Sequence, residues 1–219
     1  MAQAVTKAPD ELTYAQQDKI VNSAVSDISH IATLPEITVR IIELVENPDS
    51  TAHDLHLVIA NDPALSARVL KVVNSAFYAL PGQIGSINRA IVLLGLNAVK
   101  NIAIAASLAK LFRGGRLCPT LAARDLWENA MGVAAGVKLL SERVQLGLPD
   151  EAFLAGLIHD IGVMVEMQAR RPKLLQVVER VEQQGLTFRE AESKVFGVTH
   201  EQFGHALCEK WKFPTFLQQ

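Results

Sequence analysis

Apolar residues recur at helical spacing along almost the whole chain. Between Ile37 and Val45, for example, apolar positions follow one another at intervals of four, three and one residues, so they share one face of a helix. The segment Asn47-Pro48-Asp49 ends this helix, because the residue before a proline avoids helical backbone angles. No alternating pattern of useful strand length is present. The sequence therefore predicts an all-α fold whose helices begin near Thr13.

Capping signals divide the first part of this pattern into separate helices. The signals are Thr51 with Asp54, Asp62 with Pro63, and Ser86 after a loop that contains glycine and proline. A longer run from Asn97 to Phe112 carries Ala103, Ala105, Ala106 and Ala109, and small residues let a neighbouring helix approach closely. We therefore expect this run to form a central helix.

The segment Arg113-Gly114-Gly115-Arg116 is the best candidate for an internal boundary. It separates an N-terminal helical lobe, about 13–113, from a C-terminal lobe, about 117–219. Apolar helix faces flank the boundary, so the two lobes are expected to pack together as a single domain over 13–219. Residues 1–12 are small, polar and interrupted by Pro9, which predicts a flexible tail.

In the second lobe, one apolar stripe surrounds a polar pair. A long helix is expected from about Thr120 to Val144, and Asp150 is expected to cap the next one. That next helix turns five apolar residues inward, namely Leu154, Leu157, Ile158, Ile161 and Val165. His159 and Asp160 then lie in the middle of this element. Further helices are predicted over 172–184, 188–196 and 199–212.

Composition and charge exclude several classes of protein. With 219 residues, 49% of them hydrophobic, the chain can bury a core without the help of a disulfide or a metal. A formal charge of −2 gives no positive field for the phosphate backbone of nucleic acids. No apolar stretch reaches the roughly 20 residues of a membrane span. Cys118 and Cys208 are far apart and suit a reducing compartment, so a cytoplasmic protein is expected.

The adjacent imidazole and carboxylate of His159 and Asp160 can reach one cation from a single helix. The run 155–162 resembles the His-Asp doublet of the HD superfamily of metal-dependent phosphohydrolases. Four further segments, Leu34-Pro35, 61–75, 86–95 and 125–128, make the chain similar to the HDOD family from about residue 14 to 219. This resemblance implies a helical output or adaptor module of bacterial signal transduction, frequently without a complete metal site.

The same resemblance implies four metal ligands in active HD enzymes, and two of them are missing here. The position of the first histidine holds Asn129, whose neutral amide is a poor ligand for a transition metal. No aspartate follows Asp160 to supply the last ligand. His200 matches a histidine found downstream of the doublet in related cyclic-dinucleotide phosphodiesterases. We therefore expect no catalytic residue and no cofactor. A weak site for Fe, Mn, Ni or Zn at His159, Asp160 and His200 is the alternative.

Without a metal, the doublet needs other partners. We expect Asn129, His159 and Asp160 to form a structural polar cluster in which the Asn129 amide donates to the Asp160 carboxylate. His205 does not extend this cluster, because five residues of helix rotate it by about 140° from His200.

The remaining candidates favour structural interpretations. His53 and His56 share a helix face and are expected to be solvated, His30 is expected at the end of the first helix, and Glu128 is expected to be a surface carboxylate rather than a general base. The turn at Gly95 resembles a helix-turn-helix, but its second helix offers only Lys100 and Lys110 among alanine and isoleucine, which is the composition of a core helix.

Three functions follow in order of preference. The first is a non-catalytic HDOD signal-transduction module that binds another signalling protein, or a small ligand such as a nucleotide second messenger. The second is a metal-dependent HD-type phosphohydrolase. The third is a helix-turn-helix DNA-binding regulator, which the charge disfavours.

Overall fold

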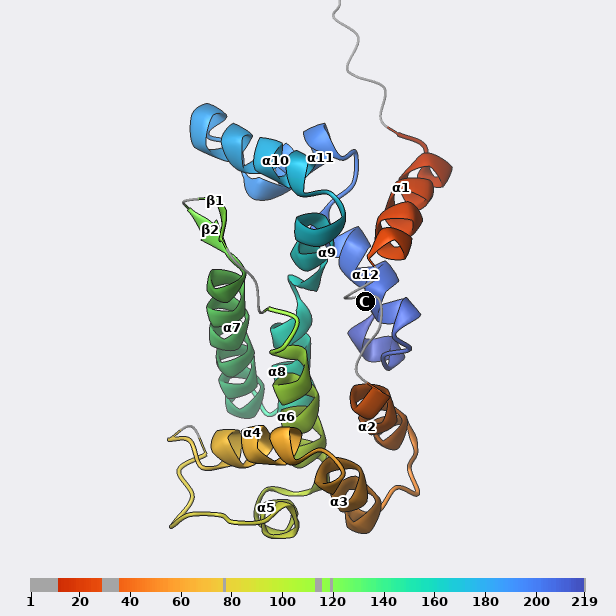
Figure 1. Cartoon of the computed structure of the whole chain (residues 1–219). Helices are drawn as coiled ribbons and strands as arrows, with labels where there is room; N and C mark the ends of the chain where they lie inside the picture. The colour runs from red at the N-terminus through yellow and green to blue at the C-terminus, as the bar shows by residue number, and fades with distance from the viewer. Residues whose placement is uncertain (1–11, 29–35, 77, 113–115, 119, 219) are drawn as a thin grey trace, which may run out of the picture.

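The computed structural model describes residues 12–28, 36–76, 78–112, 116–118 and 120–218, and within these residues it confirms the all-α fold (Figure 1). The first half contains α1 (Tyr14–Asp27), α2 (Glu36–Glu46), α3 (Ala52–Ala60), α4 (Pro63–Val73), α5 (Ile87–Leu94) and α6 (Leu96–Leu108). The second half contains α7 (Ala123–Arg143), α8 (Pro149–Ile158), α9 (Ile161–Ala169), α10 (Arg171–Gln184), α11 (Phe188–Val195), α12 (His200–Lys210) and a final 3-10 turn, Thr215–Leu217. The expected tail, His30, Leu34-Pro35 and most of the expected lobe boundary lie outside the described residues.

The predicted helix starts are confirmed by their hydrogen bonds. The side chain of Thr51 accepts from the Asp54 amide, and that of Asp62 accepts from the Leu65 amide at 2.8 Å. The Ser86 hydroxyl accepts from the Arg89 amide at the start of α5. The expectation that Asp150 caps α8 is wrong. Pro149 occupies the first helical position, so Asp150 lies inside the first turn, where it forms an ion pair with Lys138 at 2.8 Å.

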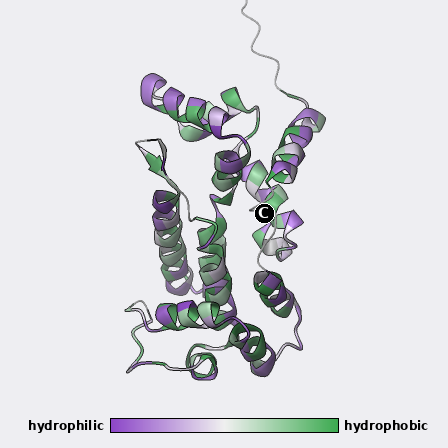
Figure 2. Ribbon diagram, in the orientation of Figure 1, coloured by the Kyte–Doolittle hydropathy of each residue, from purple (hydrophilic) through white to green (hydrophobic). Residues whose placement is uncertain are grey.

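Helix α6 is central, as its alanines predict. All of its side chains from Ala98 to Leu108 are buried, and the helix contacts α2, α4, α5 and α8. Figure 2 shows hydrophobic residues concentrated on α6 and α8 in the middle of the molecule, whereas α10 at its end is largely hydrophilic. The contact of α6 with α8 joins the two halves, and their buried side chains form a continuous core.

The second half packs as neighbouring helix pairs. Helix α8 runs beside α7, α9 packs on α12, and α10 packs on α11 (Figure 1). Helix α1 lies against α12 and α9 of this half, although its sequence position is in the N-terminal lobe. A short antiparallel pair, β1 (Arg116–Cys118) and β2 (Leu121–Ala122), precedes α7. The sequence did not predict this hairpin, since two- and three-residue strands are too short to show an alternating pattern.

The segment expected to form one helix through His159 and Asp160 is two helices. The chain leaves helical geometry at Asp160, which has φ −104° and ψ 17°, between the end of α8 and the start of α9. The His159 ring nitrogen Nδ1 lies 2.8 Å from the Gly156 carbonyl oxygen, so the ring takes an acceptor that a continuous helix offers to the Asp160 amide. The polar pair therefore lies at a helix junction.

One stretch of the described chain, Pro149–Ala169, is long and apolar enough to cross a membrane by composition alone. It consists of α8, the junction and α9, and 61% of its most apolar window is buried inside the fold. This stretch packs against α7, α6 and α12, which accounts for its apolar character.

Candidate functional site

The Asp160 carboxylate is the centre of a polar cluster at the α8–α9 junction. Its oxygen Oδ2 lies 2.9 Å from His159 Nε2, and its oxygen Oδ1 lies 3.5 Å from His200 Nε2. Burial alone raises the pKa of Asp160, but the hydrogen bond and charge of His159, together with the charge of His200, bring it below its usual value. The carboxylate is thus ionised and lies between two imidazole rings.

The His159 ring is fixed by bonds at both nitrogens. Its Nδ1 is 2.8 Å from the Gly156 carbonyl, an acceptor only, so Nδ1 carries a proton and donates. The hydrogen bond to Asp160 raises the pKa of His159 more than partial burial lowers it. Neutral His159 therefore presents an unprotonated Nε2 to Asp160, whereas protonated His159 forms a charged hydrogen bond to it.

His200 reaches the junction from the first position of α12. Its Nδ1 donates to the Glu192 carboxylate at 2.8 Å, while its Nε2 points at Asp160. Burial alone lowers the pKa of His200, but the hydrogen bond and charge of Glu192, with Glu201 and Asp160, raise it above its usual value. His200 thus connects Asp160 to a second, fully buried carboxyl group.

Two glycines place His200 against the junction. A methyl group on Gly162 would lie 1.8 Å from the His200 carbonyl oxygen and 2.8 Å from the Gly204 nitrogen. Only glycine at 162 allows α9 and α12 to approach this closely without displacement of the backbone. The contact between these helices therefore depends on the absence of a side chain.

The expected hydrogen bond from Asn129 to Asp160 is present, although it is long. The Asn129 amide nitrogen lies 3.4 Å from Asp160 Oδ2. Asn129 is an exposed residue of α7, and the extensive contact of α7 with α8 brings it to the junction. The structure thus places Asn129, His159, Asp160 and His200 together, from three separate parts of the chain.

The sequence pattern did not single out two buried glutamates next to this cluster. Glu166 and Glu192 are both fully buried, and neither Glu166 oxygen has a hydrogen-bond donor within the described part of the chain. Burial and then the negative charge of Glu192 raise the pKa of Glu166 to about 10. Glu166 is therefore protonated at neutral pH and can donate to Glu192. A carboxyl group within the apolar run of α9 was the only signal for Glu166, and the surface-like sequence of α11 gave none for Glu192.

The donor set does not fit a tightly held catalytic metal. In the described residues, no group of three or more His, Cys, Asp or Glu side chains is arranged to hold a metal ion. The Asp160 carboxylate lies between the two imidazoles, with one oxygen toward each ring, and an ion would have to displace it. The position expected for the first metal ligand holds Asn129, whose amide directs its donor nitrogen rather than its oxygen at Asp160.

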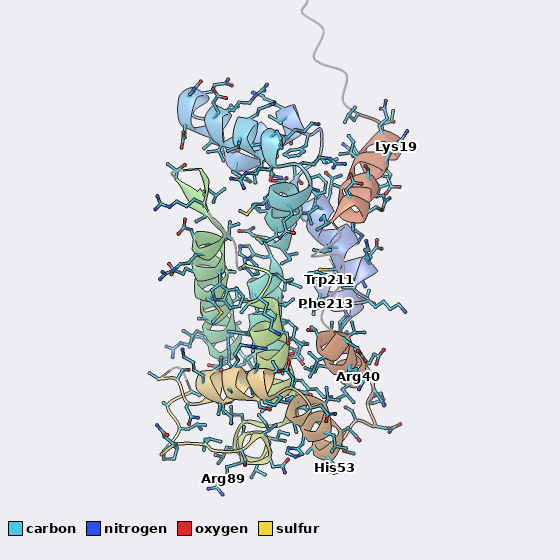
Figure 3. The ribbon with its side chains drawn as sticks, in the orientation of Figure 1. Lys19, Arg40, His53, Arg89, Trp211 and Phe213 are labelled. Atoms are coloured by element: carbon cyan, nitrogen blue, oxygen red, sulfur yellow. The ribbon has the colours of Figure 1, made fainter. Side chains whose placement is uncertain are left out.

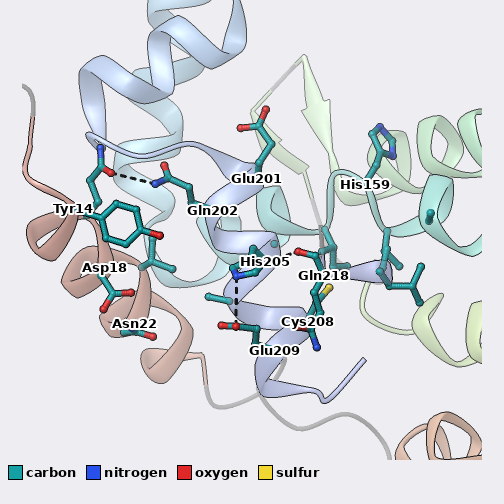
Figure 4. A pocket seen from close by; sticks show the side chains of 18 residues that line it. Tyr14, Asp18, Asn22, His159, Glu201, Gln202, His205, Cys208, Glu209 and Gln218 are labelled. Carbon is teal, nitrogen blue, oxygen red and sulfur yellow. Dashed lines mark hydrogen bonds and ion pairs between the residues drawn. The ribbon is translucent and has the colours of Figure 1, made fainter. Parts of the chain in front are cut away.

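A cavity of about 710 Å³ opens beside the cluster, with His159 at its edge (Figure 4). Helix α1 forms one wall, α12 forms the other, and the α8–α9 junction and the last turn close it. The sequence did not predict this cavity, because it lies between helices from opposite ends of the chain.

The weaker candidates do not take part in this cluster. Arg40, His53 and Arg89 project from the outer side of α2, α3 and α5 (Figure 3). His53 is exposed as expected, whereas His56 is half-buried and its Nδ1 lacks a partner in the described part. Glu128 is an exposed carboxylate paired with Arg124 at 2.7 Å. The Lys100 ammonium is buried and donates to the Leu44 carbonyl at the end of α2.

Three solved structures are similar to this chain over nearly its whole length. An HDOD domain protein of unknown function from Geobacter sulfurreducens is 30% identical, with a TM-score of 0.82 over 94% of this chain and 68% of that one. A proposed phosphohydrolase from Shewanella amazonensis SB2B is 28% identical, with a TM-score of 0.76 over 91% and 69%. A proposed signal transduction protein from Marinobacter aquaeolei VT8 is 27% identical, with a TM-score of 0.73 over 96% and 50%.

A curated relative, an uncharacterized protein of Treponema pallidum (strain Nichols), is 24% identical over 200 residues. The match covers 91% of this chain but 38% of that relative, so this chain corresponds to one part of a longer protein there. The model of the HDOD domain family matches residues 31–219. With the fold, the His-Asp junction and this match in agreement, the chain belongs to the HDOD domain family.

Proposed function

We propose that this chain is a non-catalytic regulatory module of signal transduction, and that its polar cluster is structural. The observation that carries the proposal is the environment of Asp160. Its carboxylate lies between His159, His200 and Asn129. The Asn129 amide donates to it, and each imidazole, when protonated, adds a positive charge and an Nε2 donor in place of a cation. A half-buried carboxylate satisfied in this way needs no metal ion.

A regulatory module acts through its surface, and the end of α7 supports a protein partner. Five apolar side chains between 58% and 69% exposed follow one another there, namely Leu139, Leu140, Val144, Leu146 and Leu148. Contiguous exposed apolar residues are typical of protein interaction sites. The similarity to a proposed signal transduction protein supports the same assignment. A cytoplasmic location, expected from the cysteines, is part of this proposal.

One observation favours the second candidate, a metal-dependent phosphohydrolase. His159 and His200 both use Nδ1 for a fixed acceptor and turn Nε2 toward Asp160. Histidines that bind metals are oriented in this way by their outer partners. The similarity to a proposed phosphohydrolase also supports this candidate. The two candidate functions make different predictions about metal content: the phosphohydrolase should retain a metal ion at the cluster through purification, and the regulatory module should not.

Metal analysis with a phosphodiesterase assay separates the candidates. We expect the purified protein to contain Fe, Mn, Ni and Zn well below one ion per chain, and to leave bis(p-nitrophenyl) phosphate intact when these ions are added. Stoichiometric metal and hydrolysis, both lost in Asp160→Ala and retained in Asp49→Ala, would establish the enzyme instead. Asp49 is a suitable control because it is an exposed aspartate of the α2–α3 turn, outside the cluster.

The DNA-binding alternative receives no support from the fold. The helix that would enter the major groove is α6, whose residues from Ala98 to Leu108 are buried. Duplex binding with a steep salt dependence is therefore not expected.

A further inference from the structure

The cavity between α1 and α12 has polar walls and an apolar floor. Tyr14, Asp18 and Asn22 lie four residues apart along α1, so they share one face of that helix. Figure 4 shows this face opposite the α12 side chains Gln202, His205 and Glu209. The buried residues Val21, Ile158, Ile161, Cys208 and Leu217 lie between the walls and form the floor.

The charge of the cavity is negative. Its described lining contains three carboxylates, Asp18, Glu201 and Glu209, two imidazoles, His159 and His205, and no Lys or Arg side chain. Among the described residues, Glu201 pairs with Arg189 at 3.4 Å, and the ion-pair partner of Glu209 is His205 alone, at 3.5 Å on the exposed surface. Asp18 makes no ion pair with another residue of the described chain. One carboxylate on each wall can therefore receive a cation.

The acidic walls and the apolar floor together favour one chemical class of ligand. A phosphate-bearing ligand, such as a nucleotide second messenger, would meet carboxylates where it needs cationic donors. An amine with a hydrocarbon chain can instead lay its methylene groups on the apolar floor and direct its charges to the acidic walls. The exposed ring of Tyr14 offers an aromatic face at the rim, which is favourable for an organic cation.

We propose that the cavity binds a small organic cation with at least two ammonium groups on a hydrocarbon chain, that is, a polyamine. Asp18 receives one ammonium group and Glu209 the other, while the Asn22 amide oxygen, one turn from Asp18 on the same face of α1, accepts a hydrogen bond from the first. The ligand joins α1 to α12 next to His159, so its occupancy changes how firmly α1 is held. The regulatory role of this ligand rests on the proposed function, whereas the binding of the ligand to the cavity does not.

Titration calorimetry with spermidine at low ionic strength tests the site. We expect saturable one-to-one binding, weakened about fivefold to tenfold in the double variant Asp18→Asn with Glu209→Gln. The matched control is Glu43→Gln with Glu142→Gln, which removes the same charge from exposed positions outside the cavity and should leave the affinity unchanged. All four positions are exposed, and circular dichroism checks that each variant folds.

Four outcomes would overturn the proposal. They are the absence of saturable spermidine binding, an equal loss of affinity in both double variants, displacement of spermidine by Mg²⁺ at equal charge concentration, and tighter binding of a cyclic dinucleotide by the Asp18→Asn, Glu209→Gln variant. The second and third would reveal a general response to charge, and the fourth an anion site. Metal content and phosphodiesterase activity of the same preparation report on the proposed function separately.

Discussion

The Asn74 side chain holds the loop after α4 in place with three hydrogen bonds. Its amide donates to the Leu70 and Ile84 carbonyls at 2.8 and 2.9 Å and accepts from the Ile84 amide at 2.7 Å. Asp62, at the other end of α4, is a helix cap. Both residues belong to motifs that identify the family, and both satisfy backbone groups. Their role in this chain is therefore architectural.

Removing the Asp160 carboxylate tests its structural role. In Asp160→Ala, His159, His200 and Asn129 lose their shared acceptor, and we expect the free energy of unfolding to fall by about 1–3 kcal/mol. Urea denaturation at pH 7 measures this change, with Asp49→Ala as the surface control. An unchanged midpoint in Asp160→Ala would contradict a structural role.

The buried Glu166 makes stability depend on pH. Folded protein keeps the Glu166 proton up to a pKa of about 10, whereas the unfolded chain releases it near the ordinary glutamate pKa of 4.5. Unfolding thus releases a proton between these limits, and this contribution to stability falls as pH rises. Glutamine has the same shape and no proton to lose. We therefore expect the free energy of unfolding of Glu166→Gln, relative to that of the unmodified protein, to increase steadily from pH 5 to pH 9.

Urea denaturation at pH 5.5, 7 and 9 measures the Glu166→Gln difference. Exposed Glu142→Gln on α7 is the matched control, and its difference should not vary across this range. A Glu166→Gln difference that is constant with pH would show that Glu166 is ionised in the folded protein.

At the scale of elements, the helix junction and one close crossing determine the site. The break between α8 and α9 directs His159 and Asp160 away from the apolar stripe, and the Gly162–Gly204 crossing brings His200 to them. Each feature is local to a few backbone atoms. Neither the break nor the crossing depends on the identity of surface residues.

The crossing predicts opposite effects for two glycine substitutions. Gly162→Ala forces α9 and α12 apart, and we expect a loss of about 1–3 kcal/mol or more in stability. Gly132→Ala, on the exposed side of α7 with nothing within 4 Å of the added carbon, should instead add up to about 1 kcal/mol. Thermal and urea denaturation measure both. If the two variants behaved alike, the close approach would not be needed.

At the scale of the whole molecule, the two halves share a core. Helix α6 contacts α8, and Phe112, four residues after the end of α6, packs against Trp127 of α7 with ring centroids 5.1 Å apart. Helix α1 adds a second link, because it comes from the N-terminal side and packs on α12. These contacts favour unfolding in a single step.

The two tryptophans allow the single-step unfolding of the two halves to be tested. Trp127 reports on the junction of the halves, and Trp211, buried beside Phe213, reports on the end of the chain. In Trp127→Phe and in Trp211→Phe, we expect the fluorescence midpoint in urea to equal the circular dichroism midpoint of the same variant. Separate midpoints in either variant would show that the halves unfold independently.

The sequence by itself determined the helical class, the starts of α3, α4 and α5 and the residues at the junction. These depend on short-range physics, since apolar spacing, caps and proline act within a few residues. It also identified Asn129 as a partner of Asp160, from the position of a motif. The break at Asp160 was missed, because the periodic apolar residues on both sides are equally compatible with one continuous helix.

Only the tertiary structure decided what surrounds that junction. The buried pair Glu166 and Glu192, the contact of His200 with Asp160 and the cavity between α1 and α12 all join segments distant in sequence. Such contacts depend on how helices cross, and a crossing depends on the summed packing of many side chains rather than on any local pattern. The chemistry of Asp160 is therefore encoded locally, but its environment is a property of the whole fold.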